Sequence, residues 1–323
     1  MKAAIFNGKQ NISVGERPDP KIEAPTDAIV RVVRGCVCGS DLWYYRGINQ
    51  HKIGSIGHEY IGVVEDVGSD VTDLTKGDFV IAPFTFSDGV CPACRAGFQS
   101  NCTHGGAFGD GKHDGGQGEI VRAPYAEATL VKVPGSHFTE EQLASFTALS
   151  DVMCTGYHAA RMAGVKDGDT VAVVGDGAVG LCAVIAAKKL GASRIIALSR
   201  NPARQALAAE FGATDIVAER GDDAIDAVRK LTDGAGVDAA LECVGTDQSI
   251  ETAVGITRAG GMIGAVGVPL YENFTYQSIF WKNVGIRGGV APARQYIPEL
   301  LEDVLADAST RDASLTSKPI STM

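Results

Sequence analysis

Three side chains in the first half of the chain have the types needed to ligate one metal ion through sulfur, nitrogen and oxygen. They are Cys38 in Cys-Gly-Ser-Asp-Leu-Trp, His58 in Gly-His-Glu, and Asp151 in Ser-Asp-Val. A catalytic zinc site uses three protein ligands and leaves one position open for a substrate oxygen. Each residue alone has an ordinary alternative: a buried cysteine, a core histidine, or an acid at the start of a helix. Their combination, upstream of a dinucleotide-binding motif, favours a catalytic zinc site.

Eight cysteines bear on the same question. In a reducing compartment, cysteines are more often metal ligands or core residues than disulfides. One cluster lies at 91–102 and is a candidate metal lobe, with a metal-free loop as its alternative. The remaining cysteines lie in apolar stretches, where we expect them to pack in the core: Cys36, Cys154, Cys182 and Cys243.

A glycine-rich segment has the spacing of a dinucleotide-binding turn. It runs Gly175-Asp-Gly177-Ala178-Val179-Gly180, directly after the apolar run Val-Ala-Val-Val and before a helical stretch. In that context the first glycine makes the turn, the second lets the backbone approach a pyrophosphate, and the third lets the helix pack on the strand. The helix N-terminus then stabilises the phosphate charge. The alternative is a tight strand–helix turn without a ligand.

The end of the next strand indicates which dinucleotide binds. An NAD site places an acid about 20 residues further on, where it bonds the ribose hydroxyls. Here Ser199 and Arg200 stand at that position, Arg204 follows one helical turn later, and no acid occurs before Glu210. A guanidinium can pair with a 2′-phosphate in bidentate fashion. The pattern predicts NADP rather than NAD, unless these arginines only form the solvated start of a helix.

Two kinds of element must position these residues. Short β-branched runs at 28–34, 61–67 and 79–82 predict a mostly β first part, and 140–163 predicts a long helix interrupted near Thr155-Gly156. From 170 onward strands alternate with helices at 178–190, 202–211 and 224–231, which predicts an α/β fold with a doubly wound parallel sheet. We expect a first domain at 1–152, to which 291–323 returns, and a nucleotide-binding domain at 153–290.

The charge and apolar patterning exclude some functions. A net charge of −10 argues against a nucleic-acid or anionic membrane partner. The N-terminal residues contain no apolar run long enough for a signal peptide. The longest apolar stretch, 171–187, contains Asp176 and three glycines and is a poor membrane span. We therefore expect a cytoplasmic protein.

Several motifs in the same order resemble the zinc-dependent alcohol dehydrogenases of the medium-chain dehydrogenase/reductase superfamily. They are GCVCGSDLW, GHEYIGVVEDVG, the cysteine lobe, SDVMCTGYHAA and VVGDGAVG. The resemblance extends to about residue 305. It implies a GroES-like, mostly β catalytic domain followed by a Rossmann domain. An aspartate at the third ligand position resembles the bacterial and archaeal secondary-alcohol branch.

The resemblance implies roles for the residues of the first zinc site. Cys38, His58 and Asp151 would bind the catalytic zinc, and Glu59 would be an inner- or outer-shell carboxylate. Asp41 would accept the far imidazole N–H of His58 and fix its tautomer.

The resemblance also suggests a proton path. Ser40 would contact the substrate oxygen and begin a proton relay. Family members often carry a histidine near the position of Trp43, and an indole cannot act as a base, so the proton must leave by another route. Trp43, Phe84 and Trp281 are candidates for apolar pocket walls, or ordinary core aromatics.

The cysteine lobe matches the structural zinc lobe of the family, with one departure. Asp88 stands where the first cysteine is usual, so the ligand set would be Asp88, Cys91, Cys94 and Cys102. A carboxylate can ligate zinc, which makes a closed four-ligand site feasible.

The expected function is hydride transfer between NADP and a primary or secondary alcohol, or its aldehyde or ketone. The resemblance suggests a homodimer or homotetramer. Two alternatives stay open: a zinc-independent quinone or enone reductase, and a non-catalytic NADP-binding protein with a damaged C-terminus.

The last residues depart from the family pattern. After Ala306 the chain is polar and lacks clear periodicity. A single inserted nucleotide in a back-translation restores a continuation of the kind that the family shows. We expect a frameshifted, truncated C-terminus, the alternative being a genuinely divergent tail.

Overall fold

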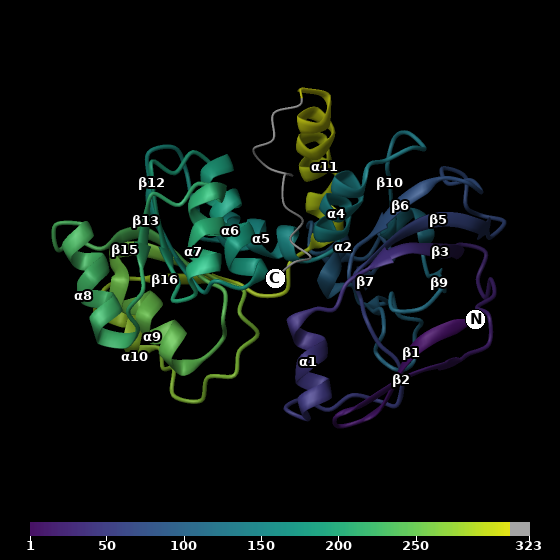
Figure 1. Cartoon of the computed structure of the whole chain (residues 1–323), viewed down its shortest axis with the longest axis horizontal. Coiled ribbons are helices and arrows are strands. Elements are labelled where there is room, and N and C mark those ends of the chain that lie inside the picture. Colours follow the sequence, from purple (N-terminus) through teal and green to yellow (C-terminus); the bar gives the residue numbers. More distant parts are fainter. Residues whose placement is uncertain (311–323) are drawn as a thin grey trace. The chain divides into compact units, whose positions relative to one another are not determined.

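The computed structural model describes residues 1–310, with side chains to Ala306 (Figure 1). The chain divides into two compact units, the first built from Met1–Asp151 together with the segment from Pro292, and the second from Val152–Ala291. The expected frameshift concerns a tail that lies mostly outside the described residues. None of the described helices is long and apolar enough to cross a membrane.

The first unit is built mainly from short antiparallel strands. Its largest sheet has five strands in the order β10-β6-β5-β3-β9. The strands predicted at 28–34, 61–67 and 79–82 are confirmed as β3, β5 and β6. The strands of this unit are β1 Lys2–Gly8, β2 Asn11–Glu16, β3 Ala28–Gly35, β4 Gly54–Ser55, β5 Tyr60–Val67, β6 Phe79–Ala82, β7 Thr85–Phe86, β8 Gly106–Ala107, β9 Ile120–Ala123 and β10 Val131–Lys132.

The helices of the first unit are short except for two. Helix α4 and helix α11 pack against each other, and α11 buries Ile297, Leu300 and Leu301. The main core lies among the strands, where Tyr60 and Phe108 pack edge to face with ring centroids 5.2 Å apart. The helices are α1 Gly39–Arg46, α2 Pro92–Arg95, the 3₁₀ turn η1 Gln99–Asn101, α3 Ala126–Thr129, α4 Glu140–Leu149 and α11 Ala293–Thr310.

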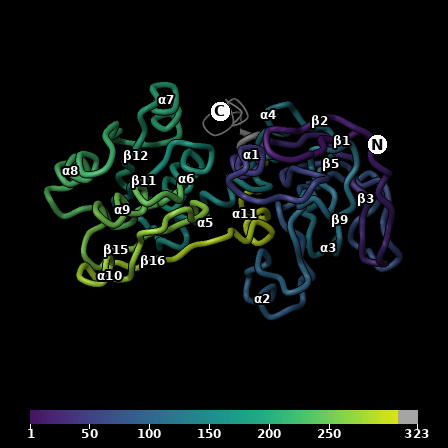
Figure 2. The backbone as a smooth tube through the Cα atoms, turned by 90° about the horizontal axis from the view of Figure 1, so that it is seen from below, coloured from purple at the N-terminus to yellow at the C-terminus, as the bar shows by residue number. Residues whose placement is uncertain are grey.

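The second unit is a parallel sheet of six strands in the order β13-β12-β11-β14-β15-β16. This confirms the predicted doubly wound α/β fold. Helices α5 and α6 lie on one side of the sheet and α8 and α9 on the other (Figure 2). The elements are α5 Val152–Met162, β11 Thr170–Val174, α6 Ala178–Lys189, β12 Arg194–Leu198, α7 Pro202–Phe211, β13 Asp215–Val217, α8 Gly221–Leu231, β14 Val237–Glu242, α9 Asp247–Ile256, β15 Thr257–Ala265, α10 Gln277–Phe280 and β16 Gly285–Gly288.

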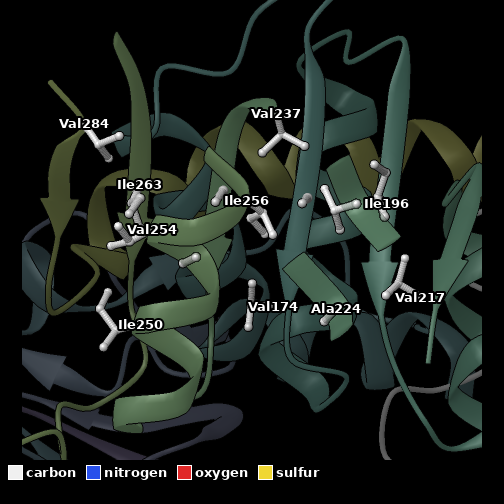
Figure 3. Packing of buried hydrophobic residues seen from close by; sticks show 14 residues of the cluster. Val174, Ile196, Val217, Ala224, Val237, Ile250, Val254, Ile256, Ile263 and Val284 are labelled. Atoms are coloured by element: carbon white, nitrogen blue, oxygen red, sulfur yellow. The ribbon is translucent and has the colours of Figure 1, made fainter. Parts of the chain in front are cut away.

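Continuous apolar runs in its strands explain why this sheet is buried between layers of helices. Four of the five residues of β11 are buried, because a parallel sheet covered by helices is buried on both faces. Figure 3 shows Val174 and Ile196 of the strands together with Ala224 of α8 and Ile250 of α9, all members of one buried cluster. This core holds the strand ends, from which the glycine-rich turn emerges.

The prediction for 140–163 was wrong about the place of the interruption. Helix α4 ends at Leu149 and α5 begins at Val152, so the break falls at Ser150-Asp151 rather than at Thr155-Gly156. Gly156 lies inside α5, where an added Cβ would come within 2.5 Å of the Ala183 backbone nitrogen on α6. That glycine therefore permits close helix packing. The actual break places Asp151 at the junction of two helices.

Candidate active site and cofactor pocket

Four predicted side chains of the first unit converge on one point. Each of Cys38, His58, Glu59 and Asp151 offers a potential ligand atom, and these atoms all lie within 4.8 Å of one another. Cys38 precedes α1, His58 and Glu59 precede β5, and Asp151 follows α4. The Cys38 Sγ lies 3.7 Å and the His58 Nε2 3.3 Å from Asp151 Oδ2. The fold thus assembles sulfur, nitrogen and oxygen donors from distant segments.

The electrostatics of this cluster suit a cation. Burial, and then the charge of Asp151, raise the pKa of Glu59 to about 8. Burial also raises the pKa of the Cys38 thiol. Glu59 Oε1 is buried without a hydrogen-bond partner, and such a group is costly unless a charge or donor compensates it. A zinc ion among these residues would supply that compensation, so the donor set fits the metal.

His58 is held from its far side by Asp41. The His58 Nδ1 lies 3.4 Å from Asp41 Oδ1, and Asp41 is only 3% exposed. The other carboxylate oxygen, Asp41 Oδ2, accepts the backbone N–H of Cys38 at 3.0 Å. Because a histidine ligates zinc through one nitrogen, a carboxylate at the other nitrogen orients the ring.

Sequence reasoning missed Gln117, which supports this carboxylate. Its Nε2 donates to Asp41 Oδ2 at 3.1 Å and to the Cys36 carbonyl at 3.3 Å. Gly57 has a φ of +87°, and an added Cβ there would come within 2.5 Å of the Gln117 side chain. Gln117 lies in a glycine-rich loop far along the chain from Asp41, so no local signal pointed to it.

The residues expected around the substrate differ in where the structure places them. Ser40 and Trp43 lie on α1, and both are half-buried. The Phe84 ring packs edge-on against the His58 ring with centroids 6.2 Å apart, which suits an apolar wall. Trp281 belongs to the second unit and is 79% exposed. Phe84, by contrast, contacts a residue of the metal cluster, which supports it as a wall residue.

The cysteine lobe forms a second compact ligand group. The ligand atoms of Asp88, Cys91, Cys94 and Cys102 also lie within 4.8 Å of one another. The Cys91 sulfur is 3.5 Å from that of Cys94 and 3.8 Å from that of Cys102. Tetrahedral zinc with bonds of about 2.3 Å separates its sulfur ligands by roughly 3.8 Å. The thiols therefore have the spacing that zinc requires.

Asp88 is held by partners that the sequence did not reveal. Its Oδ1 accepts the backbone N–H groups of Val90 and Cys91, and its Oδ2 lies 2.6 Å from His104 Nδ1. The N–H of Cys91 and then the His104 imidazole lower the pKa of the Asp88 carboxyl. Asp88 is therefore a fixed carboxylate, and His104 orients it from outside the ligand group.

The three glycines of the predicted dinucleotide turn differ in what surrounds them. Gly175 follows β11 with a φ of +117°. An added Cβ on Gly180 would come within 2.0 Å of the Gly175 carbonyl oxygen, which explains the close approach of α6 to the turn. Gly177 is the N-cap of α6 and faces open space, and Ala178 and Val179 follow it in the first turn of the helix. The open N-terminus of α6 is where an anion would be stabilised.

A cavity of about 590 Å³ lies beside this turn, within the second unit. Its lining includes the end of β12 and also the segment between β13 and α8, whose Glu219 and Arg220 sequence reasoning missed. The lining residues are Val174, Gly175, Asp176, Gly177, Leu198, Ser199, Arg200, Glu219, Arg220, Gly221, Ala224, Cys243, Val244, Thr246, Gln248, Ser249 and Thr252. The volume and the mixed polar and apolar lining suit one end of a dinucleotide.

The structure corrects one premise of the cofactor prediction. No acid follows the turn in sequence before Glu210, but Asp176 inside the turn reaches the end of β12. Ser199 Oγ donates to Asp176 Oδ2 at 2.8 Å, and Arg204 Nη1 lies 3.1 Å from Asp176 Oδ1. A carboxylate is thus present where the sequence indicated none, and Arg204 already has an anionic partner.

Comparisons with known proteins agree with this architecture. The family model described as "Alcohol dehydrogenase GroES-like domain" matches residues 24–135, and the one described as "Zinc-binding dehydrogenase" matches residues 178–306. The chain is 36% identical over 316 residues to "Zinc-type alcohol dehydrogenase B" of Aspergillus flavus, covering 94% of this chain and 72% of that protein.

Two further relatives extend the match. The "Uncharacterized zinc-type alcohol dehydrogenase-like protein AdhB" of Bacillus subtilis is 36% identical over 338 residues, covering 94% of this chain and 89% of that protein. The solved structure of alcohol dehydrogenase TADH from Thermus sp. ATN1 has a TM-score of 0.86 and 36% identity, over 95% of this chain and 89% of that one.

Proposed function

Because the chain belongs to the zinc-dependent alcohol dehydrogenase family of the medium-chain dehydrogenase/reductase superfamily, we propose that it transfers hydride between NADP and a primary or secondary alcohol, or its aldehyde or ketone. The observation that supports this most directly is the convergence of Cys38, His58 and Asp151 with Glu59. The first three would hold the catalytic zinc. Asp151 as the oxygen donor favours the secondary-alcohol branch of the family.

The chain's own residues have distinct tasks in this reaction. When bound, zinc acts as a Lewis acid that lowers the pKa of an alcohol. Asp41 keeps the imidazole of His58 oriented, so that Nε2 is available as a ligand. Phe84 packs edge-on against the His58 ring and would shield that side of the cluster from water. Asp41 and Phe84 would thus hold the His58 ligand in place before substrate binds.

Ser40 is the residue that we assign to the substrate proton. A hydroxyl can accept one proton while it passes on another, which suits the first step of a relay. Trp43 on the same helix offers only an N–H donor, so it cannot take the proton from Ser40. The proton would therefore leave Ser40 by a route that does not use Trp43.

Some residues that line the pocket favour NADP, and one disfavours it. Ser199 and Arg200 at the end of β12, and Arg220 after β13, line the cavity and suit a 2′-phosphate. Asp176 opposes it, because its carboxylate pairs with Arg204. We expect NADP to remain the better cofactor in the wild type. Arg200→Ala should cost roughly ten- to a hundredfold in kcat/KM for NADP and little for NAD. A wild-type preference for NAD would refute the assignment.

A turnover assay with a panel of alcohols tests the activity itself. Formation of NADPH is followed by absorbance before chelation, after removal of zinc, and after zinc is restored. We expect activity to disappear with the metal and to return with it. Turnover that persists in zinc-free protein would favour the zinc-independent reductase reading, and no turnover at all would favour the non-catalytic reading.

We propose the oligomeric state from the family resemblance. We expect a homodimer or homotetramer, which size-exclusion chromatography with light scattering measures directly. A monomer at micromolar concentration would contradict this expectation.

A further inference from the structure

Asp176 occupies a place in the cofactor pocket that the motif alone does not assign. It stands between Gly175 and Gly177, in the turn from β11 to α6, and its side chain is 24% exposed. The carboxylate extends to the end of the neighbouring strand β12 and lines the cavity there. In an NAD site of this fold, an acid at the end of the second strand bonds the ribose hydroxyls. Asp176 brings a carboxylate to the same end of the sheet from a different segment.

The partners of Asp176 are the groups that a 2′-phosphate would need. Ser199 donates its hydroxyl to one carboxylate oxygen at 2.8 Å, and Arg204 lies 3.1 Å from the other. Burial opposes ionisation of Asp176, but the hydrogen bonds from Ser199 and Arg204 outweigh it and lower the pKa of this carboxyl. Asp176 is therefore an anion at neutral pH, and it balances the charge of Arg204.

A ribose diol and a 2′-phosphate meet this carboxylate in opposite ways. Each carboxylate oxygen has two lone pairs, so Asp176 can accept a further hydrogen bond from a ribose hydroxyl. A 2′-phosphate has oxygens that accept hydrogen bonds and carries negative charge. It must compete with Asp176 for Ser199 and Arg204 while it is repelled by the carboxylate.

We propose that Asp176 is the residue that sets cofactor discrimination in this pocket, by binding the ribose of NAD and by limiting the affinity for NADP. This inference rests on the proposed dinucleotide function. It predicts that neutralising Asp176 changes the two affinities in opposite directions. If the Asp176 carboxylate only held the turn against α7, its neutralisation would change the affinities for NADP and NAD in the same direction.

The test is isothermal titration calorimetry of the wild type and Asp176→Asn with NADP⁺ and NAD⁺. The asparagine keeps the size of the side chain and an oxygen for Ser199, but it removes the charge and releases Arg204. We expect NADP⁺ to bind about tenfold more tightly, and we expect NAD⁺ to bind more weakly because its ribose loses a charge-assisted hydrogen bond. Asp233→Asn, at an exposed positive-φ position outside the pocket lining, is the matched control for net charge.

The second variant is Arg204→Gln, which leaves Asp176 unbalanced in the pocket. NADP⁺ binding should then weaken by about tenfold or more, and NAD⁺ binding should change less. This result remains available even if Asp176→Asn does not fold. An NADP⁺ to NAD⁺ affinity ratio that stays within about twofold of the wild type in a folded Asp176→Asn protein would overturn the inference alone. Failure of both dinucleotides to bind the wild type would instead overturn the proposed function.

Discussion

Replacing Asp41 by asparagine tests how the first zinc site is held together. The Asp41 side chain is buried, with Oδ2 accepting from the Cys38 backbone and from Gln117 and Oδ1 lying 3.4 Å from His58 Nδ1. For Nε2 of His58 to ligate zinc, the ring proton must sit on Nδ1, where it needs an acceptor. An asparagine that still accepts from Cys38 and Gln117 turns its NH₂ group toward His58. That arrangement favours the tautomer whose Nε2 carries the proton and cannot bind metal.

The magnitude follows from the loss of one outer-shell acceptor. Such losses typically weaken metal binding about 10- to 100-fold, which is about 1.4 to 2.8 kcal/mol. We expect the catalytic zinc of Asp41→Asn to be released at a correspondingly lower concentration of a competing chelator. The zinc of the cysteine lobe serves as an internal reference, because its candidate ligands form a separate group.

A matched control separates this effect from a general loss of stability. Asp73→Asn removes the same charge from an exposed residue of the same unit, and it should leave both metals unaffected. The reasoning fails if Asp41→Asn retains the catalytic zinc with wild-type affinity at the same pH. It also fails if the control loses zinc as readily.

Four other expectations test the remaining site and fold assignments. Cys38→Ser should lose both tight catalytic zinc binding and hydride transfer, and full zinc content with full activity would disprove its role as a ligand. Metal analysis of the intact protein should find one zinc for each of the two ligand groups, and Cys94→Ser should remove one; a single zinc unaffected by this change would show that the lobe is empty. Gly156→Ala should lower the free energy of unfolding by about 1–3 kcal/mol in a denaturant titration, because the new Cβ meets backbone of α6; an unchanged midpoint would contradict the packing. The Arg194 side chain lowers the pKa of Asp215, so this pair stabilises the fold at neutral pH, and its contribution declines as the pH falls from about 4 through the lowered pKa of Asp215; Asp215→Asn should remove less than about 1 kcal/mol at pH 7 and progressively less as the pH is lowered below about 4.

Local patterns carried most of the fold prediction. The run from β11 through the glycine turn into α6 was predicted correctly because a buried strand, a tight turn and a helix start each depend on neighbouring residues. The break between α4 and α5 was misplaced, because Gly156 looks like a helix breaker until α6 is known to lie against it. Propensity cannot distinguish a glycine that ends a helix from one that admits a neighbour.

The outer contacts of the site escaped prediction for a related reason. Gln117 and Asp41 are separated by 76 residues, and His104 reaches Asp88 across 16. Neither glutamine nor a loop histidine stands in a motif that indicates such a role. Only the folding of the 109–118 loop over the β-strands, and of the lobe on itself, brings these donors to their carboxylates.

The sequence by itself determined the fold class, and it pointed to the two candidate ligand groups and to the glycine-rich turn. These depend on spacing within short segments, where chain geometry leaves few arrangements. The sequence also assigned Cys38 and Asp151 to one site, and the tertiary structure supplies the geometry that brings these residues together from 113 positions apart. Only the tertiary structure decided that Asp176 meets Ser199 and Arg204 at the end of β12. Such contacts depend on strand order and on where each helix ends. For that reason the sequence indicated a pocket without an acid, whereas the fold supplies one from the neighbouring turn.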